Sequence, residues 1–166
     1  MIYINQCRNI YLSRFSDDGV FSKYLFEKCS ENIEYIEEDG EIVSFLFLLP
    51  CVIEGENAKY IFAAATKEEC EGKGYMSELL KRVIKKENLL FLRPANEKLI
   101  AFYERFGFKL ITATAKDNSF PNLKPQESFL SLAQQIEPDE DSEYLFMYLS
   151  KKDIEFDNIY FQYSMD

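Results

Sequence analysis

Residues 66–80 read TKEECEGKGYMSELL, a polar turn with two glycines that leads into an amphipathic segment. From Met76 on, apolar residues recur at i, i+3, i+4, i+7 and i+8, which predicts a helix ending near Lys86. The glycines let several backbone N–H groups converge, and the helix N-terminus adds unpaired donors and a positive dipole end. The stretch predicts a site for a phosphate or pyrophosphate, with a purely structural turn as the alternative.

Two common phosphate-binding patterns do not fit this turn. A P-loop needs Ser or Thr directly after Gly-Lys, but Gly74 follows Lys73. The dinucleotide-binding fingerprint needs a third glycine at position 77, which is Ser77. Both patterns are therefore rejected.

A second informative stretch covers residues 89–108. Residues 89–92 predict a short buried strand, and Asn96 is suited to cap the helix that follows. Gly107 would end that helix, with the Phe108 N–H bonded to the Tyr103 carbonyl in a Schellman motif. The Tyr103 phenol could then donate a proton. The alternative is that Tyr103 is only part of the core.

The remaining periodicities predict a mixed α/β sheet within a single domain of residues 1–166. A helix is expected over 18–29, with Ser16 and Asp17 as capping candidates. Strands are expected over 33–37, 42–49 (ended by Pro50), 59–66, 108–114 and 144–149, and 154–163 is a candidate for one more. The first two of these strands form a hairpin around residues 38–40. Residues 54–58 and 115–143 are expected to be mostly loop.

Composition and charge argue against several classes of function. The chain has 166 residues, a net charge of −10, and no histidine. An acidic chain is a poor partner for nucleic acid and favours cationic ligands. Without histidine, Ser-His-Asp and Cys-His hydrolases and most zinc enzymes are excluded, and the four widely spaced cysteines predict no metal site. With no membrane-length apolar run and no signal-peptide pattern, we expect a cytoplasmic protein without membrane contact.

Taken together, residues 66–80, Asn96 and residues 103–108 closely resemble the GNAT superfamily of acetyltransferases, and most of all its uncharacterised bacterial members. The resemblance is specific over residues 60–108, and the predicted hairpin fits it. It implies the GNAT fold, an α/β (α+β) fold with a mixed central sheet, helices on both faces and splayed central strands. It also implies transfer of an acetyl group from acetyl-CoA to an amine, by direct attack and without a metal.

The resemblance assigns roles to individual residues. The GNAT signature Gln/Arg-x-x-Gly-x-Gly/Ala, whose amides hold the CoA pyrophosphate, maps onto residues 71–76: Glu71, Gly72, Lys73, Gly74, Tyr75 and Met76. Here Glu71 replaces Gln or Arg, and Met76 replaces the small residue. The pantetheine arm would pair with the backbone at Ala63, Ala64 and Ala65, although three alanines could equally serve close packing. Asn96 would contact the CoA arm, and Tyr103 would protonate the departing thiolate.

Several functional questions stay open at this level. The predicted strand 59–66 contains no acid, so Glu41, Glu54 and Glu68 are the candidates for the general base by elimination. The acceptor is expected to be a small-molecule or peptide amine, and the charge favours a cationic one. Nothing in the sequence indicates the oligomeric state. Two alternatives remain: an inactive GNAT-fold module that binds acyl-CoA or a partner protein, and an unrelated anion-binding α/β protein.

Overall fold

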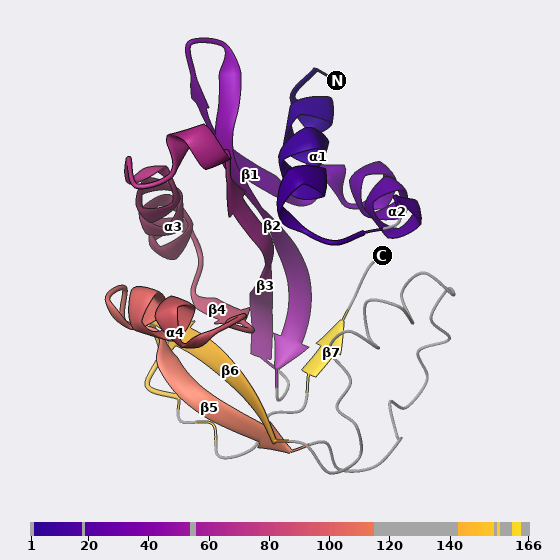
Figure 1. The fold of residues 1–166 in the computed structure, drawn as a ribbon. Coiled ribbons are helices and arrows are strands. Elements are labelled where there is room, and N and C mark those ends of the chain that lie inside the picture. The colour runs from indigo at the N-terminus through magenta and orange to yellow at the C-terminus, as the bar shows by residue number, and fades with distance from the viewer. Residues whose placement is uncertain are drawn as a thin grey trace. The chain divides into compact units, whose positions relative to one another are not determined.

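The computed structural model of the chain (Figure 1) describes residues 2–17, 19–53, 56–114, 143–154, 156 and 161–163. The chain forms two compact units. The first contains Met1–Leu49 and Tyr60–Glu87, and the second contains Pro50–Lys59 and Asn88–Asp166. Strands β2 and β3 each contribute residues to both units.

Three neighbouring strands form the sheet of the first unit: β1 (Ile33–Glu38), β2 (Glu41–Ile53) and β3 (Glu56–Thr66). The predicted hairpin is confirmed, because β1 and β2 pair antiparallel up to Glu38↔Glu41. Asp39 and Gly40 both have positive φ, 51° and 80°, as a type I′ hairpin turn requires. This local turn chemistry made the hairpin predictable.

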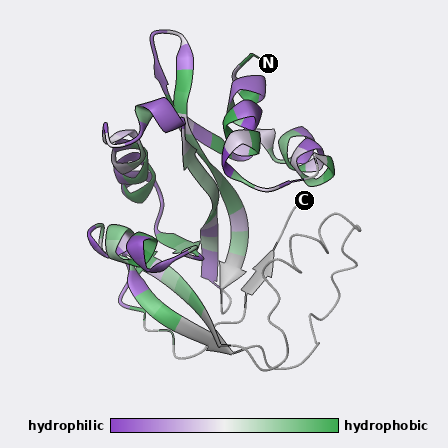
Figure 2. Cartoon of the chain, in the orientation of Figure 1, coloured by the Kyte–Doolittle hydropathy of each residue, from purple (hydrophilic) through white to green (hydrophobic). Residues whose placement is uncertain are grey.

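Helices cover both faces of these strands (Figure 1). Helices α1 (Ile2–Arg14) and α2 (Val20–Lys28) lie on one face, and α3 (Tyr75–Lys86) lies on the other. Residues 42–49 of β2 are all buried, as a strand covered on both sides requires. Phe26 of α2 packs on Phe45 and Phe47 with ring centroids 6.0 and 5.0 Å apart. Figure 2 shows the hydrophobic colouring that runs along β2.

Helix α1 has no counterpart in the predicted elements. Its buried residues, Cys7, Ile10 and Tyr11, follow helical spacing, but Ile2 and Leu12 are apolar and exposed. Apolar side chains are therefore spread around the helix instead of forming one stripe, and the periodicity that identifies α3 is weak here. The sequence pattern alone therefore does not predict α1, and its buried side becomes apparent only in the tertiary structure.

Two predictions about element ends are wrong. Neither Ser16 nor Asp17 caps α2: the N-cap is Gly19, with φ 86°, and Asp17 Oδ1 instead accepts from the Gly19 N–H at 2.6 Å. Pro50 does not end β2, which continues to Ile53. It lies between the last β2 residue paired with β1, Phe47, and the first paired with β7, Cys51. Its missing N–H therefore removes a bond from neither pairing.

In the second unit, β4 (Leu89–Leu92), β6 (Glu143–Ser150) and β5 (Lys109–Thr114) lie side by side and antiparallel. Helix α4 (Glu97–Glu104) connects β4 to β5, and β7 (Phe161–Tyr163) pairs with the end of β2. The predicted strands 108–114 and 144–149 are confirmed within one residue. Short 3₁₀ helices lie at Ser30–Asn32 and Glu68–Cys70, in the first unit.

The predicted loops are tested only in part. Residues 56–58, expected to be loop, already belong to β3, whereas 54 and 55 lie outside the described residues. Positions 115–142 of the long predicted loop also lie outside them. Of the possible strand 154–163, only 161–163 is a described strand. None of the described helices combines the length and apolar character needed to span a membrane.

A buried serine connects β2 to the end of β3. Ser44 is fully buried, its Oγ donates to the Ala65 carbonyl at 3.2 Å, and it lies 2.9 Å from Thr66 Oγ1. We expect Ser44→Ala to lower the free energy of unfolding by about 1–3 kcal/mol, because buried polar groups lose a partner. Denaturant unfolding measures this loss. The matched control is Ser22→Ala, equally buried but with one longer bond of 3.3 Å to Gly19 O. Equal small losses in both variants would contradict the prediction.

Candidate active site

The turn predicted to bind an anion is open. Gly72 and Gly74 have φ values of 74° and 88°, and no described atom lies within 4 Å of where a Cβ would stand on either. Gly74 is the N-cap of α3, which has no side-chain cap. The first helical bond runs from the Glu78 N–H to the Gly74 carbonyl at 3.0 Å. The N–H groups of the first helical turn before Glu78 therefore have no helical acceptor and are available to an anion.

The backbone N–H groups just before the glycines already donate hydrogen bonds within the turn. The Cys70 N–H donates to the Lys67 carbonyl at 2.9 Å, and the Glu71 N–H donates to the Glu68 carbonyl at 3.2 Å. The free donors of the turn therefore follow Glu71, within the glycine segment and the start of α3. Lys73 is exposed and has no ion pair among the residues described here.

Glu71 has a partner that the sequence analysis missed. The Arg14 guanidinium, at the end of α1, forms an ion pair with its carboxylate across 57 residues of sequence. Both side chains are partly exposed, at 34% and 49%. The substitution of Glu for Gln or Arg is thus accompanied by a cation from another element. No sequence signal pointed to it, because α1 itself was not predicted.

Tyr75 and Met76 complete the turn at the start of α3, where both are half-buried. The Tyr75 hydroxyl donates to Glu38 Oε2, and this carboxylate raises the pKa of Tyr75 to about 12. The bond holds the beginning of α3 against the end of β1. Tyr75 therefore helps to position the turn through its side chain.

One candidate for the general base, Glu41, already forms a hydrogen bond with a lysine. Lys67 Nζ lies 2.7 Å from Glu41 Oε2, and this hydrogen bond lowers the pKa of Glu41. A carboxylate with a lowered pKa is a weaker base, so Glu41 is poorly suited to take a proton from an ammonium group. Glu68 is exposed at the start of its 3₁₀ helix, and Glu54 lies outside the described residues.

The alanine segment of β3 is distorted at its first residue. Ala63 has φ 51°, in the left-handed region that residues with a Cβ rarely adopt. Such a residue interrupts a regular ladder and turns its neighbouring peptide groups out of the strand. Ala65 is buried, whereas Ala63 and Ala64 are half-buried. Ala65 therefore has a packing role, whereas Ala63 and Ala64 are less buried and lie in the same unit as the glycine turn.

In the second unit, Asn96 is the predicted cap of α4, since its Oδ1 accepts from the Leu99 N–H at 3.0 Å. The predicted Schellman motif is also present. The Phe108 N–H donates to the Tyr103 carbonyl at 3.4 Å, and Gly107, with φ 91°, donates to Glu104 O at 2.9 Å. These local bonds fix the backbone on both sides of the Tyr103 side chain.

Tyr103 is buried against Phe108, with ring centroids 5.6 Å apart. Burial raises its pKa to about 12, so the phenol keeps its proton at neutral pH. Its hydroxyl makes no hydrogen bond within the described part of the chain, and it is not among the fully buried polar atoms that lack a partner there. A buried tyrosine usually satisfies its hydroxyl. The Tyr103 hydroxyl is unpaired and not fully buried, so it could donate its proton to a ligand.

The raised pKa of Tyr103 predicts a loss of stability at high pH. Because folding raises this pKa from 10 to about 12, the contribution is complete below pH 10 and disappears as the pH rises through 12. Between pH 9 and pH 11, the wild-type protein should lose about 1 kcal/mol more free energy of unfolding than Tyr103→Phe. Urea unfolding at both pH values measures the difference. Equal losses would show that Tyr103 ionises as in the unfolded chain.

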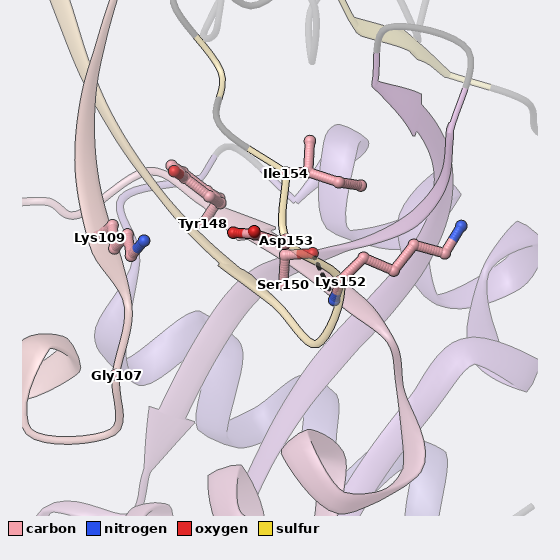
Figure 3. A pocket seen from close by; sticks show the side chains of 7 residues that line it. All are labelled: Gly107, Lys109, Tyr148, Ser150, Lys152, Asp153 and Ile154. Carbon is pink, nitrogen blue, oxygen red and sulfur yellow. Dashed lines mark hydrogen bonds between the residues drawn. The ribbon is translucent and has the colours of Figure 1, made fainter.

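A separate pocket lies in the second unit (Figure 3). It is an open depression beside Gly107, with Lys109, Tyr148 and Lys152 among its lining residues. Lys152 Nζ already pairs with Glu56 Oε2 at 2.7 Å. Neither Asn96 nor Tyr103 lines the pocket, so it is not the predicted site. Among the described residues, no group of His, Cys, Asp and Glu side chains could hold a metal ion.

The open glycine turn at the start of α3 belongs to an α+β fold of strands and helices. Residues 4–108 match the model of the Acetyltransferase (GNAT) family, and the chain belongs to this family. The expected fold class is thereby confirmed. No curated protein matches the chain in sequence.

Solved structures show the same fold. A Corynebacterium glutamicum protein described as histone acetyltransferase HPA2 and related acetyltransferase is 15% identical, with a TM-score of 0.60 over 90% of this chain and 92% of that one. Arabidopsis thaliana Naa50, in complex with the bisubstrate analogue CoA-Ac-MVNAL, is 19% identical, with a TM-score of 0.54 over 90% and 93%. An Enterococcus faecalis probable N-acyltransferase is 17% identical, with a TM-score of 0.53. That match covers 68% of this chain, which spans only about a third (33%) of the longer protein.

Proposed function

We propose that this protein transfers an acetyl group from acetyl-CoA to an amine. The observation that carries the proposal is the open turn at Gly72 and Gly74, whose free N–H groups suit the CoA pyrophosphate. Family membership and the CoA-containing analogue bound to Arabidopsis thaliana Naa50 support the same ligand. Glu71, which stands where the family has Gln or Arg, is the feature that favours an inactive module, and its ion pair with Arg14 weakens that alternative.

The reaction would proceed in one direct transfer. The N–H groups that follow Glu71 hold the pyrophosphate, and the distorted backbone at Ala63 and Ala64 offers a peptide N–H to the thioester carbonyl. The amine nitrogen attacks the carbonyl carbon, the C–S bond breaks, and the sulfur leaves as a thiolate. Tyr103, protonated at neutral pH, supplies the proton that the thiolate takes up. The attacking nitrogen releases its own proton to a base or to water.

A two-stage experiment tests this proposal. Thermal unfolding with and without acetyl-CoA detects binding, because only a ligand of the folded state raises the midpoint. Release of free thiol from acetyl-CoA is then measured over a panel of amines. Binding together with amine-dependent thiol release is expected. Binding without release on any amine favours the inactive module, and stabilisation by inorganic pyrophosphate but not by CoA favours an unrelated anion-binding protein.

The acceptor is proposed to be a cationic amine, a small molecule or a peptide, because the chain carries a net charge of −10. The rate at low acceptor concentration should fall as salt rises from about 0.05 to 0.5 M, since screening weakens the attraction. The control is a neutral acceptor such as an aromatic amine, whose rate should not follow salt in this way. Preference for a neutral or anionic acceptor would contradict this assignment.

A further inference from the structure

The pair of Arg14 and Glu71 joins two elements of the first unit at the glycine turn. Arg14 is the last residue of α1, and Glu71 directly precedes Gly72. The Arg14 Nη2 is the guanidinium nitrogen that contacts Glu71 Oε1. Both side chains remain partly exposed, and exposed ion pairs add little to stability. Stability alone therefore gives little reason for a cation at this position.

The charges near the turn make this cation important for an anionic ligand. Glu68, Glu69 and Glu71 all stand within the segment that leads to Gly72. Lys67, the cation at the start of that segment, is already bonded to Glu41 at 2.7 Å. A pyrophosphate entering the turn would thus meet several carboxylates. The guanidinium of Arg14 offsets the charge of Glu71, the carboxylate that directly precedes the glycine segment.

Arginine also has the geometry to do more than neutralise. Its guanidinium presents five N–H donors in a planar fork, and the contact with Glu71 engages one nitrogen, Nη2. The fork can therefore hold a carboxylate on one side and a phosphate oxygen on the other. Its place at the C-terminal end of α1 suits a positive charge as well.

We propose that Arg14 binds the pyrophosphate of the CoA substrate, bridging it to Glu71 from the end of α1. The inference rests on the proposed function, since it assumes that the glycine turn holds this group. It assigns α1 a direct part in binding acetyl-CoA. The competing explanation is that Arg14 only neutralises Glu71 and never touches the ligand.

A double-mutant cycle separates these two explanations. Isothermal titration with CoA at low salt compares the wild type with Arg14→Gln, Glu71→Gln and the double variant. Arg14→Gln should weaken CoA binding at least about 10-fold, because it removes a charge-assisted contact to the ligand and leaves Glu71 without its partner. In the Glu71→Gln background, Arg14→Gln should still weaken binding about 5-fold or more. If Arg14 only neutralised Glu71, this second step would leave the affinity unchanged, and the inference would be overturned.

Further controls test whether the affinity loss in Arg14→Gln depends on the pyrophosphate. Lys81→Gln removes one positive charge from α3 without removing any described bond, and it should change the affinity less than about 2-fold. The loss caused by Arg14→Gln should persist with dephospho-CoA, which retains the pyrophosphate, and vanish with pantetheine, which lacks it. A loss of similar size with pantetheine would overturn the inference, because it would reveal a general disturbance of the site.

Two further outcomes distinguish a failure of this inference from a failure of the proposed function. If the wild type binds no CoA, the proposed function fails and the inference fails with it. If the wild type binds CoA and the variants bind equally well, the inference alone is wrong. Arg14→Lys, which keeps the charge but not the fork, should bind more weakly than the wild type and more tightly than Arg14→Gln. This variant also serves as the test if Arg14→Gln does not fold.

Discussion

Gly74→Val is expected to abolish acetyl-CoA binding while the protein remains folded. Gly74 has φ 88°, which a β-branched residue adopts only at a cost of about 1–2 kcal/mol. Nothing described lies within 4 Å of the added Cβ, so the backbone around Gly74 has room for a first side-chain atom. The new side chain instead projects into the space that a phosphate would occupy, or shifts the N–H groups that would bind it. Isothermal titration with acetyl-CoA measures the loss.

The β1–β2 turn provides a matched control for this variant. Gly40 lies in the same unit, has φ 80°, and also has no described atom within 4 Å of a Cβ position. Gly40→Val should therefore suffer similar backbone strain and a similar decrease in unfolding temperature, yet bind acetyl-CoA as the wild type does. Wild-type affinity in Gly74→Val would show that the turn does not hold the ligand. Equal loss in both variants would attribute the effect to stability.

Tyr103→Phe is expected to lower the rate of acetyl transfer by about 10²-fold or more, with little change in acetyl-CoA affinity. The reason is that only the hydroxyl is removed, and with it the proposed proton donor. The hydroxyl makes no hydrogen bond within the described residues, so the packing against Phe108 should survive. Single-turnover rates and titration, measured on the same preparation, separate chemistry from binding.

Tyr148→Phe is the control for the loss of a tyrosine hydroxyl. Tyr148 is as buried as Tyr103, each being 6% exposed, and it lies in the same unit. Its ring packs on Phe156, with centroids 4.9 Å apart. The control variant should keep the wild-type rate. A wild-type rate in Tyr103→Phe as well would show that Tyr103 is a core residue and that another group, or water, protonates the thiolate.

Much of the fold was predictable because its signals are local. Helix α3 follows from its apolar stripe, and α4 from Asn96 at one end and Gly107 at the other. The Schellman bonds of Tyr103 involve residues five or fewer positions away, so a short stretch of sequence already specifies them. The same holds for the turn at Asp39 and Gly40.

Other parts of the candidate site depended on contacts between distant residues. Arg14 reaches Glu71 across 57 residues, and Lys67 reaches Glu41 across 26, and no periodicity or motif encodes either pair. That Glu41 is poorly suited as a base follows only from the second contact.

By itself, then, the sequence determined the α3 turn, the caps of α4 and the GNAT resemblance, since each depends on neighbours along the chain. Only the tertiary structure decided that residues 2–14 form a helix, that Ala63 is left-handed and that Glu71 is paired. The physical reason is that apolar burial, strand distortion and ion pairing are set by what packs across the sheet. Local propensity is too weak to specify any of them.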